Sequence, residues 1–362
     1  MGRWKSNEDI TIARSAKRAF FPLDEQLEVS GQLWSDGLVR EMVWLSGAMS
    51  SYGAVEEVLR RIGQLTISDT SAWRVSQAVG SQFQRMSEQE SCAANALPQS
   101  GEVPVVREPV RVRIGVALDG FIFNLRKEGW KECKMATLYE VAVQPGTDAD
   151  TGEMVERAHA VKQSYVAQLG GPEAIGEMAW AEAKRRGWES ASDSQVLGDG
   201  ALWIWHQAAL HFGDSHQLVD WYHAKTHLTQ AAKLLHDEGS VAYTRWFNQH
   251  ETLLYQGHAD SIANHLLAAA KTSPANAQPL TSAAAYFQNN HLRMNYLEMR
   301  ELEWPIGSGM VESGAKQYKA RFSGPGMRWS RSGAENLLPI RSAILSHRFD
   351  QLYAASIALP PS

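Results

Sequence analysis

Two apolar runs that each end in Asp-Gly constrain the fold of this chain more than any other feature of the sequence. Residues 112–120 read VRIGVALDG and residues 195–200 read QVLGDG, and both have the composition of a buried strand. Since ligands bind at the carboxyl ends of strands in open α/β sheets, we expect Asp119 and Asp199 to lie at one edge of a sheet. Either Asp-Gly taken alone is more typical of a hairpin turn. The occurrence of both after hydrophobic runs favours the strand-end interpretation.

Further strand and helix patterns predict a mixed five-stranded sheet. Strands are expected at residues 121–125, 133–143 and 216–222. The apolar spacing over residues 154–169 and 173–186 is typical of helices. Together with the two Asp-Gly strands, these patterns give the order three strands, helix, strand, helix and strand. That order resembles the α/β ribonuclease H-like folds, in which helices flank the sheet.

The chain before the sheet reads as a helical domain over residues 1–86. Apolar residues recur there at helical spacing, and Ser68 has the features of an N-cap for the last helix. A helix, a turn that contains Gly63 and a capped helix are compatible with a DNA-binding helix-turn-helix. A packed helical hairpin without DNA recognition is the alternative. Residues 87–110 are polar and contain several prolines, which predicts a linker.

The rest of the chain divides into three predicted parts. Residues 111–223 hold all the expected strands and form the first part of a catalytic core. Residues 224–303 show helical spacing only, which predicts an all-helical insertion. Residues 304–362 are expected to complete the core with basic C-terminal helices.

The distribution of charge leaves room for a nucleic-acid partner. The net charge of −5 argues against a polyanion, but the charge is uneven. Between Ser313 and Arg348, seven Lys or Arg residues stand against one acid, Glu335. Cys92 and Cys133 have no pairing pattern, and the sequence has no signal-peptide pattern or long apolar run. We therefore expect a cytoplasmic protein, associated with the nucleoid when bound to DNA, and no membrane partner.

A third acid, Glu312, follows a turn of small residues. Residues 307–313 read GSGMVES, and the pattern that continues from them places Glu312 in the first turn of a helix. Glu312 and Lys316 also fit an exposed i,i+4 pair of little energetic value. Such a surface pair does not explain the small-residue turn before it, so we favour a functional acid.

Three carboxylates at one site indicate hard divalent cations. We predict that Asp119, Asp199 and Glu312 are the catalytic residues and the metal ligands. Mg²⁺ takes oxygen ligands, and two such ions activate a nucleophile and stabilise the leaving oxygen of a phosphodiester. Mn²⁺ prefers similar ligands and is expected to substitute.

Asp220 and His223 form an Asp-x-x-His group at the end of the strand predicted for residues 216–222. We expect both to be auxiliary residues that brace the active site or the DNA. The alternative is that His223 only caps the strand end through a backbone hydrogen bond. His223 and His227 also have an i,i+4 spacing that suits zinc, but no cysteine accompanies them, which disfavours a zinc site.

Basic and aromatic side chains after Glu312 predict a segment that contacts DNA. Trp329, flanked by Arg328 and Arg331, is expected to stack on a base or to grip the DNA backbone. Most of the other tryptophans are expected in the core. The predicted DNA contacts are Lys316, Lys319, Arg321, Arg328, Trp329 and Arg331.

Seven motifs in a fixed order resemble those of the ISKra/ISLre-type insertion-sequence transposases, which are related to the Mutator-like group. They are residues 118–120 (LDG), 129–134 (GWKECK), 198–205 (GDGALWIW), 220–224 (DWYHA), 293–296 (RMNY), 307–313 (GSGMVES) and 326–330 (GMRWS). The resemblance runs from about residue 114 to residue 348. It implies that Asp119, Asp199 and Glu312 form an Asp-Asp-Glu catalytic triad. It also places the Cys/Asp-x-x-His motif of the family on Asp220 and His223.

The resemblance implies a Mg²⁺-dependent DNA transposase. Such an enzyme cleaves DNA by hydrolysis at the ends of its element and then joins the freed 3′-OH to target DNA, commonly as a homo-oligomer. Two departures from the family pattern are Cys133, where an apolar residue is expected, and the absence of an N-terminal cysteine cluster. Two other functions remain open: a domesticated protein that binds DNA without catalysis, and a ribonuclease H-like nuclease that cuts without joining.

Overall fold

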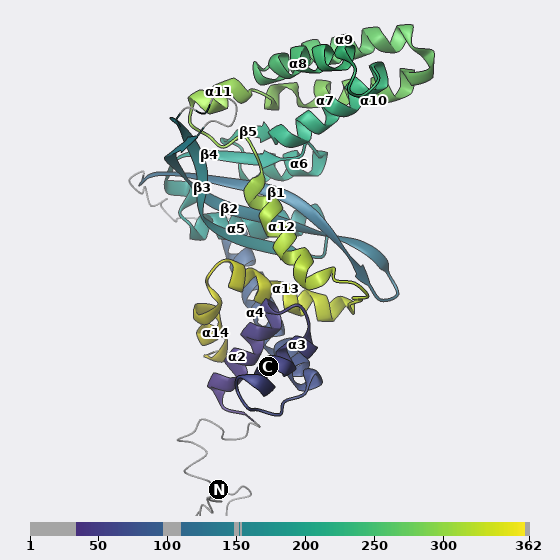
Figure 1. Cartoon of the computed structure of the whole chain (residues 1–362). Helices are drawn as coiled ribbons and strands as arrows, with labels where there is room; N and C mark the ends of the chain where they lie inside the picture. The colour runs from purple at the N-terminus through teal and green to yellow at the C-terminus, as the bar shows by residue number, and fades with distance from the viewer. Residues whose placement is uncertain (1–33, 97–109, 148–151, 153, 359–362) are drawn as a thin grey trace, which may run out of the picture.

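A five-stranded mixed sheet forms the centre of the molecule (Figure 1). The computed structural model describes residues 34–96, 110–147, 152 and 154–358. The strand order is β3-β2-β1-β4-β5, with β1, β2 and β3 antiparallel in turn and with β4 and β5 parallel to β1. The predicted α/β class with a mixed five-stranded sheet is therefore confirmed. The strands are β1 Val110–Leu125, β2 Gly129–Thr147, β3 Met154–Gln168, β4 Ala191–Gly198 and β5 His216–Val219.

β1 is longer than the sequence pattern predicts. It does not end at Asp119 but continues to Leu125, paired with β2 as far as its last residue. Its parallel pairing with β4, in contrast, ends where Ala117 lies opposite Leu197. The prediction of a separate strand after Asp119 is wrong, because β2 supplies a partner for the whole of this extension. Asp119 and Asp199 therefore each lie two residues beyond the last parallel pair.

Residues 154–168 form a strand, where the sequence pattern predicts a helix over residues 154–169. β3 pairs antiparallel with β2 from Met154, opposite Thr147, to Gln168, opposite Lys134. Most of this strand is only partly buried, so its sequence does not need a strict alternation of apolar and polar residues. The apolar residues that it contains therefore also fit a helical spacing. The pairing with β2 decides between strand and helix, and no pattern within this segment predicts that pairing.

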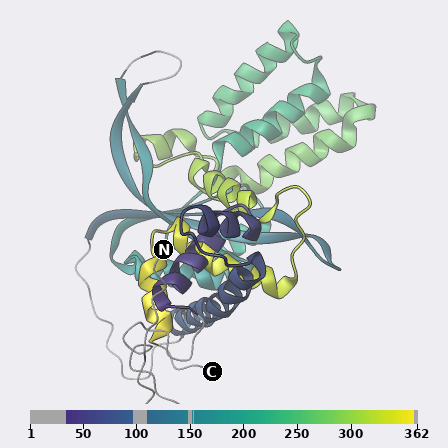
Figure 2. The same ribbon diagram turned by 60° about the horizontal axis from the view of Figure 1, so that its bottom comes forward.

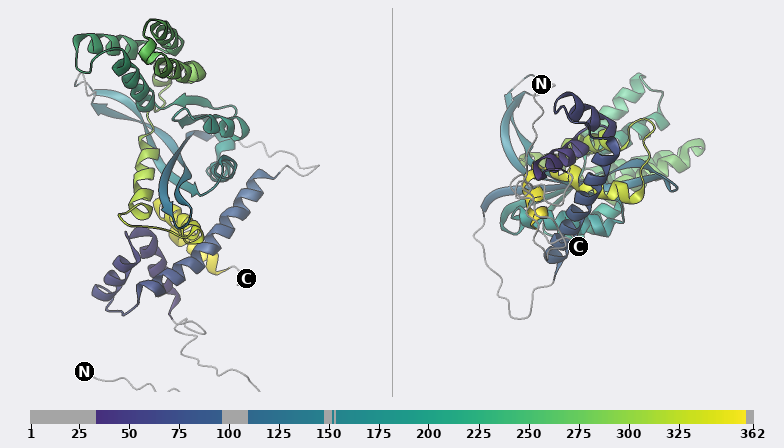
Figure 3. Two further views of the ribbon diagram at one scale, coloured as in Figure 1. Left: turned by 90° about the vertical axis from the view of Figure 1, so that its right-hand side faces the viewer. Right: turned by 90° about the horizontal axis from the view of Figure 1, so that it is seen from below.

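Helices cover both faces of the sheet, as Figure 3 shows from the side. α12 (Gly309–Phe322) crosses one face and contacts β1 and β2. α5 (Pro172–Arg185) lies against β2 and β3 on the other face, with α6 (Leu202–His211) beside it. Aromatic side chains join α12 to the sheet, since the ring centroids of Phe121 and Tyr318 are 5.2 Å apart in a stacked arrangement.

Three N-terminal helices pack against two C-terminal helices at one end of the molecule, which Figure 2 brings forward. Ser68 caps α4 as predicted, because its hydroxyl accepts a hydrogen bond from the Ser71 N–H at 3.3 Å. α4 continues to Asn95, so the linker predicted for residues 87–110 begins too early, and residues 97–109 lie outside the described part. The five helices are α2 Asp36–Ala48, α3 Tyr52–Arg61, α4 Asp69–Asn95, α13 Arg331–Leu345 and α14 Phe349–Ile357.

Two buried arginines connect these N-terminal and C-terminal helices. The Arg321 Nε of α12 donates to the Ser46 carbonyl at 2.8 Å, and the Arg341 Nη1 of α13 donates to the Gly47 carbonyl at 3.1 Å. Both carbonyls belong to the last turn of α2. The carboxyl end of a helix carries partial negative charge, so the two guanidinium groups are well placed to bind it.

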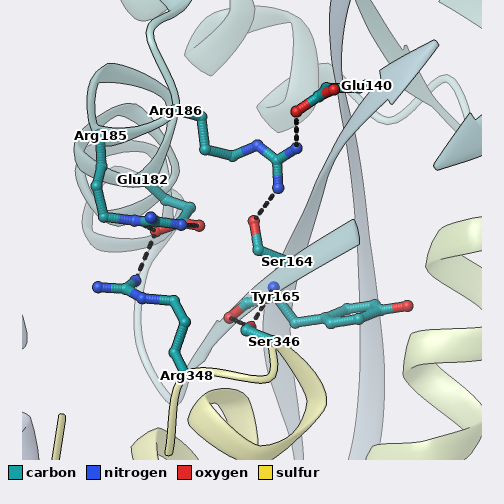
Figure 4. Close-up of polar contacts among 8 residues, drawn as sticks. All are labelled: Glu140, Ser164, Tyr165, Glu182, Arg185, Arg186, Ser346 and Arg348. Atoms are coloured by element: carbon teal, nitrogen blue, oxygen red, sulfur yellow. Dashed lines mark hydrogen bonds and ion pairs between the residues drawn. The ribbon is translucent and has the colours of Figure 1, made fainter. Parts of the chain in front are cut away.

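A polar cluster joins α5 and β3 to the junction of α13 and α14 (Figure 4). Glu182 is only 6% exposed and pairs with Arg185 and with Arg348, whose Nη1 lies 3.0 Å from its carboxylate. The Ser346 hydroxyl accepts a hydrogen bond from the Tyr165 N–H at 2.9 Å. Arg348 is one of the basic residues of the C-terminal segment, but its guanidinium is engaged by Glu182 and stabilises the fold.

A helical unit lies at the end of the molecule opposite the N-terminal helices (Figure 1). As predicted for residues 224–303, it contains helices and loops but no strand within the described residues. None of the helices in the described ranges is both long and apolar enough to cross a membrane. The helices of this unit are α7 Trp221–Leu235, α8 Val241–Tyr255, α9 Ala259–Thr272, α10 Ala277–Asn290 and α11 Tyr296–Glu301, with short 3-10 turns at Pro274–Asn276 and His291–Arg293. A further 3-10 turn, Trp188–Ser190, lies between α5 and β4.

Candidate active site

Asp119 and Asp199 meet beyond the parallel pairing of β1 and β4. Each follows the last parallel pair by two positions, and the two charges interact. Burial raises the pKa of the Asp119 carboxyl, and the nearby charge of Asp199 raises it further. A hydrogen bond from the Gly120 N–H to the Asp119 Oδ1, at 2.7 Å, acts in the opposite direction. Two carboxylates thus share a partly desolvated edge of the sheet, where a cation would stabilise both.

The loop that carries Asp199 is held from two sides. The Asp199 Oδ1 accepts a hydrogen bond from the Ala201 N–H at 2.8 Å, and its carbonyl accepts one from the Tyr286 hydroxyl at 3.1 Å. Gly200 has a φ of +102°, and a Cβ there would lie 2.9 Å from the Tyr286 ring. The Tyr286 ring in turn stacks on His227, with centroids 3.6 Å apart. α10 and α7 therefore fix the position of this acid.

Asp220 is fully buried and connects three segments of the site. Its Oδ1 accepts a hydrogen bond from the His223 N–H at 2.7 Å, and its Oδ2 accepts one from the Ser308 N–H at 2.5 Å. Its own N–H donates to the Gly198 carbonyl at 2.7 Å. The Ser308 carbonyl accepts from the Glu312 N–H at 3.1 Å in the first turn of α12. Through its side chain and its backbone N–H, this one residue thus ties together the end of β4, the start of α7 and the start of α12.

His223 and Glu312 come together next to Asp220. Ligand atoms of the three residues lie within 4.8 Å of one another. The hydrogen bond with Asp220 raises the pKa of the His223 imidazole against the opposing effect of burial, and the charges of Asp199 and Asp119 raise it further. Burial acts to raise the pKa of Asp220, but hydrogen bonds from His223 and Ser308 outweigh it and lower that pKa. The Asp220–His223 pair is therefore stabilised as an ion pair.

Asp119, His223 and Glu312 line one cavity of about 420 Å³. Lys316 and Lys319 line it as well, and both are exposed. They follow Glu312 at i+4 and i+7, a spacing that places all three side chains on one stripe of α12. The cavity is thus lined by both acids and ammonium groups, a combination that suits a metal-bound phosphate group.

The three predicted metal ligands are neighbours but do not form one tight cluster. In the described part of the chain, the tight group is Asp220, His223 and Glu312 and not Asp119, Asp199 and Glu312. Both Asp220 oxygens already accept backbone N–H groups, so this residue is poorly suited to hold a metal. The Glu312 carboxylate, among the described residues, has no hydrogen bond and no ion pair, and the surface pair with Lys316 does not form. The free oxygens therefore belong to the acids that the sequence predicted, and hard oxygen donors fit Mg²⁺.

Exposed cations account for part of the predicted DNA-binding segment. Lys316 and Lys319 line the cavity described above, and Arg328 is exposed on the loop between α12 and α13. Arg331 is also exposed, but its guanidinium pairs with Glu128 at 2.5 Å and with Glu335 at 3.3 Å. Its charge is thus largely offset, which weakens the prediction that it contacts DNA.

Arg321 and Trp329 correct the prediction, because both are buried. Arg321 is 2% exposed and Trp329 is 9% exposed. The Trp329 Nε1 donates to the Phe322 carbonyl at 2.9 Å, and its ring centroid lies 4.9 Å from the Arg321 guanidinium. The basic and aromatic composition that predicted a DNA surface in this segment therefore partly describes a core contact between cation and ring.

The sequence interpretation missed two tyrosines of the site. Tyr222 is 62% exposed and lines the active-site cavity as well as the neighbouring one beside Gly307. Tyr286 lies on α10 and holds the Asp199 loop. The position of Tyr222 between Asp220 and His223 is a signal that could have identified it, whereas nothing local marks Tyr286.

No protein-family model matches the chain, and no curated protein matches it at a significant level.

Proposed function

We propose that this protein is a DNA transposase of the Asp-Asp-Glu type, which cleaves at the ends of its element and joins the resulting 3′-OH to target DNA. The observation that carries the proposal is the convergence of β1, α7 and α12 on one cavity, with the end of β4 close enough for Asp199 to act on Asp119. Asp119 and Glu312 line that cavity, and the charge of Asp199 acts on Asp119. The ordered motifs that resemble the ISKra/ISLre-type transposases support the same function.

The fold proposed for this enzyme is ribonuclease H-like. Three antiparallel strands, a helix, a parallel strand, a helix and a second parallel strand are compatible with it. Residues 111–223 and 304–362 would form the core around the insertion at residues 224–303. Residues 1–86 would form the DNA-binding domain, and a homo-oligomer would assemble on paired DNA ends.

The charged side chains of the site have separate roles in this mechanism. Asp119, Asp199 and Glu312 would hold Mg²⁺, or Mn²⁺ in its place, which supplies an activated nucleophile and stabilises the leaving oxygen. Asp220 positions the first turn of α12, and His223 balances the charge of the acids. Lys316 and Lys319 bind the phosphates that flank the scissile bond.

Asp199→Asn tests the assignment of the acids. We expect this variant to lose more than about 100-fold in cleavage, because a direct metal ligand should matter at least as much as the groups around a metal site. Nicking of a supercoiled plasmid that carries the DNA flanking the gene, with Mg²⁺, measures the loss. DNA binding should persist. Cleavage at the normal rate would mean that Asp199 is not a ligand.

The products of the same reaction separate transposition from its alternatives. Joined products with the element's own ends support a transposase. Cleavage without joining indicates a nuclease, and DNA binding without cleavage, unchanged by Asp119→Ala, indicates a domesticated DNA-binding protein.

A further inference from the structure

A second cavity, of about 470 Å³, lies where the N-terminal helices meet the end of α12. The start of α3, the first turns of α4, the β1–β2 turn and the loop between α12 and α13 all contribute to it. We call it the aromatic–arginine pocket, after the six side chains that define it. These are Tyr52, Trp73, Arg126, Arg321, Arg328 and Trp329. Its volume is on the scale of small-molecule sites.

The inner wall of the pocket carries a buried cation that no carboxylate balances. The Arg321 guanidinium lies 4.9 Å from the ring centroids of both Tyr52 and Trp329. Its Nε is bonded to the Ser46 carbonyl, but its Nη2 has no hydrogen-bond partner. Within the described residues, no Asp or Glu forms an ion pair with it. This nitrogen has almost no accessible surface, so the guanidinium adds positive charge to the wall of the pocket and makes no direct contact with a ligand.

The rim of the pocket has the composition of a nucleotide site. Trp73 is 40% exposed, and Arg126 and Arg328 are both exposed. The Arg126 Nε donates to the Arg328 carbonyl at 3.1 Å, which places the β1–β2 turn against the loop. One acid, Asp69, also lines the pocket, and its carboxylate accepts a hydrogen bond from the Thr70 hydroxyl at 3.0 Å. Three guanidinium groups against one carboxylate leave the pocket positively charged.

We propose that the aromatic–arginine pocket binds one unpaired nucleotide of a DNA strand. The base stacks on Trp73, and its phosphate binds Arg126 and Arg328, with the buried charge of Arg321 in the wall behind them. An exposed tryptophan beside arginines is the combination that holds unstacked bases and their backbone. A base inside a duplex has both faces covered, so the pocket selects a nucleotide that has left the stack. The proposal rests on the proposed function in that the partner is DNA.

The pocket and the active-site cavity lie along the same helix. Glu312 and Arg321 are nine residues apart on α12, which is roughly 13 Å along the helix axis. Lys316 and Lys319 lie between them on the side of the active-site cavity. A strand held in the pocket can therefore continue past both lysines to the acids, with the unpaired nucleotide a few positions from the scissile phosphate.

Binding of two matched DNA duplexes tests the proposal. One contains a single unpaired 2-aminopurine, and the other has the same sequence fully paired. We expect Trp73→Ala to weaken binding of the first duplex about tenfold, the scale of one base–aromatic stack, and to change binding of the second less than twofold. Fluorescence anisotropy gives both affinities. In the wild type, 2-aminopurine fluorescence should fall on binding as the base stacks on Trp73, and Trp73→Ala should remove this change.

Trp44→Ala is the matched control, since Trp44 is 39% exposed on α2 and does not line the pocket. It should leave both affinities and the fluorescence change intact.

Replacing Arg126 and Arg328 together should also make the binding affinity less sensitive to salt. The slope of log affinity against log salt concentration should fall by the equivalent of about one to two released counterions. Equal effects of Trp73→Ala on both duplexes, or no effect on either, would overturn the pocket assignment while leaving DNA binding in place. A wild-type protein that binds neither duplex would overturn the proposed function as well, and tighter binding of the matching RNA would overturn the choice of DNA.

Discussion

At the scale of single residues, the candidate site depends most on Asp220, a side chain that is poorly suited to hold metal. Both of its oxygens accept backbone N–H groups, one from His223 in α7 and one from Ser308 ahead of α12. It has no exposed surface, so water cannot replace either bond. Its charge also stabilises the protonated form of His223. The position of Glu312 relative to the sheet acids is therefore set by a neighbouring carboxylate.

We expect Asp220→Asn to lower the free energy of unfolding by about 2–4 kcal/mol, because an amide group turns an N–H₂ toward one of two buried N–H donors. Urea unfolding followed by circular dichroism measures this change. Asp214→Asn, in the exposed loop before β5, is the control and should change stability by less than about 0.5 kcal/mol. Similar small effects of the two substitutions would contradict the positioning role of Asp220.

At the scale of elements, α4 and α13 approach so closely that only glycine fits at one position of α4. A Cβ at Gly80 would lie 2.0 Å from the Asn336 carbonyl oxygen of α13. This oxygen belongs to the backbone of a helix, so a side-chain rotation cannot relieve the clash. The Asn336 side chain also donates to the Gln77 Oε1 at 3.0 Å. This contact joins the N-terminal helices to α13, the helix that begins directly after the loop lining the aromatic–arginine pocket.

Gly80→Ala should destabilise the protein by at least about 2 kcal/mol, because the two helices must separate to admit the methyl group. Intrinsic helix propensity alone predicts the opposite result, an increase in the free energy of unfolding of up to about 1 kcal/mol. Gly37→Ala in α2 isolates that propensity effect, since nothing lies within 4 Å of its Cβ position. Thermal unfolding of both variants decides the question: a stabilised Gly80→Ala would show that α4 and α13 are not in this contact.

Local signals explain which elements could be predicted from the sequence. Ser68 caps α4 through a residue three positions away, and the helices of residues 224–303 follow from apolar spacing within each helix. β3 could not be predicted, because its state depends on pairing with β2. The strand-end position of Asp199 was predictable, but the continuation of β1 past Asp119 was not, since it requires the same long-range pairing.

The same distinction holds for the candidate site. Its acids follow from local motifs, whereas the burial of Arg321 depends on a hydrogen bond to Ser46, 275 residues away in the sequence. The bond from Ser308 to Asp220 spans 88 residues. No pattern within either segment contains these contacts, so composition alone assigned Arg321 and Trp329 to an exposed surface, whereas both side chains are largely buried.

At the scale of the whole molecule, the polar cluster of Figure 4 couples the stability of the fold to pH. Burial acts to raise the pKa of Glu182, but hydrogen bonds and charge from Arg185 and Arg348 outweigh burial and lower that pKa below its usual range. A carboxyl whose pKa is lower in the folded state stabilises the fold above the unfolded pKa of about 4.3. This contribution is lost as the pH falls through the lowered pKa of the folded state.

Glu182→Gln should therefore flatten the acid side of the stability profile. At pH 7 we expect a loss of about 3 kcal/mol, because two arginines are left without their carboxylate. Below about pH 4.3 the wild type takes up a proton at this site on unfolding and the variant does not, so the difference between them should shrink. Urea unfolding from pH 7 to pH 3 measures the profile, and Glu177→Gln, exposed on the same helix, should keep the wild-type slope. If the profiles of Glu182→Gln and the wild type stay parallel down to pH 3, the cluster does not hold α5, β3 and the C-terminal helices together through this charge.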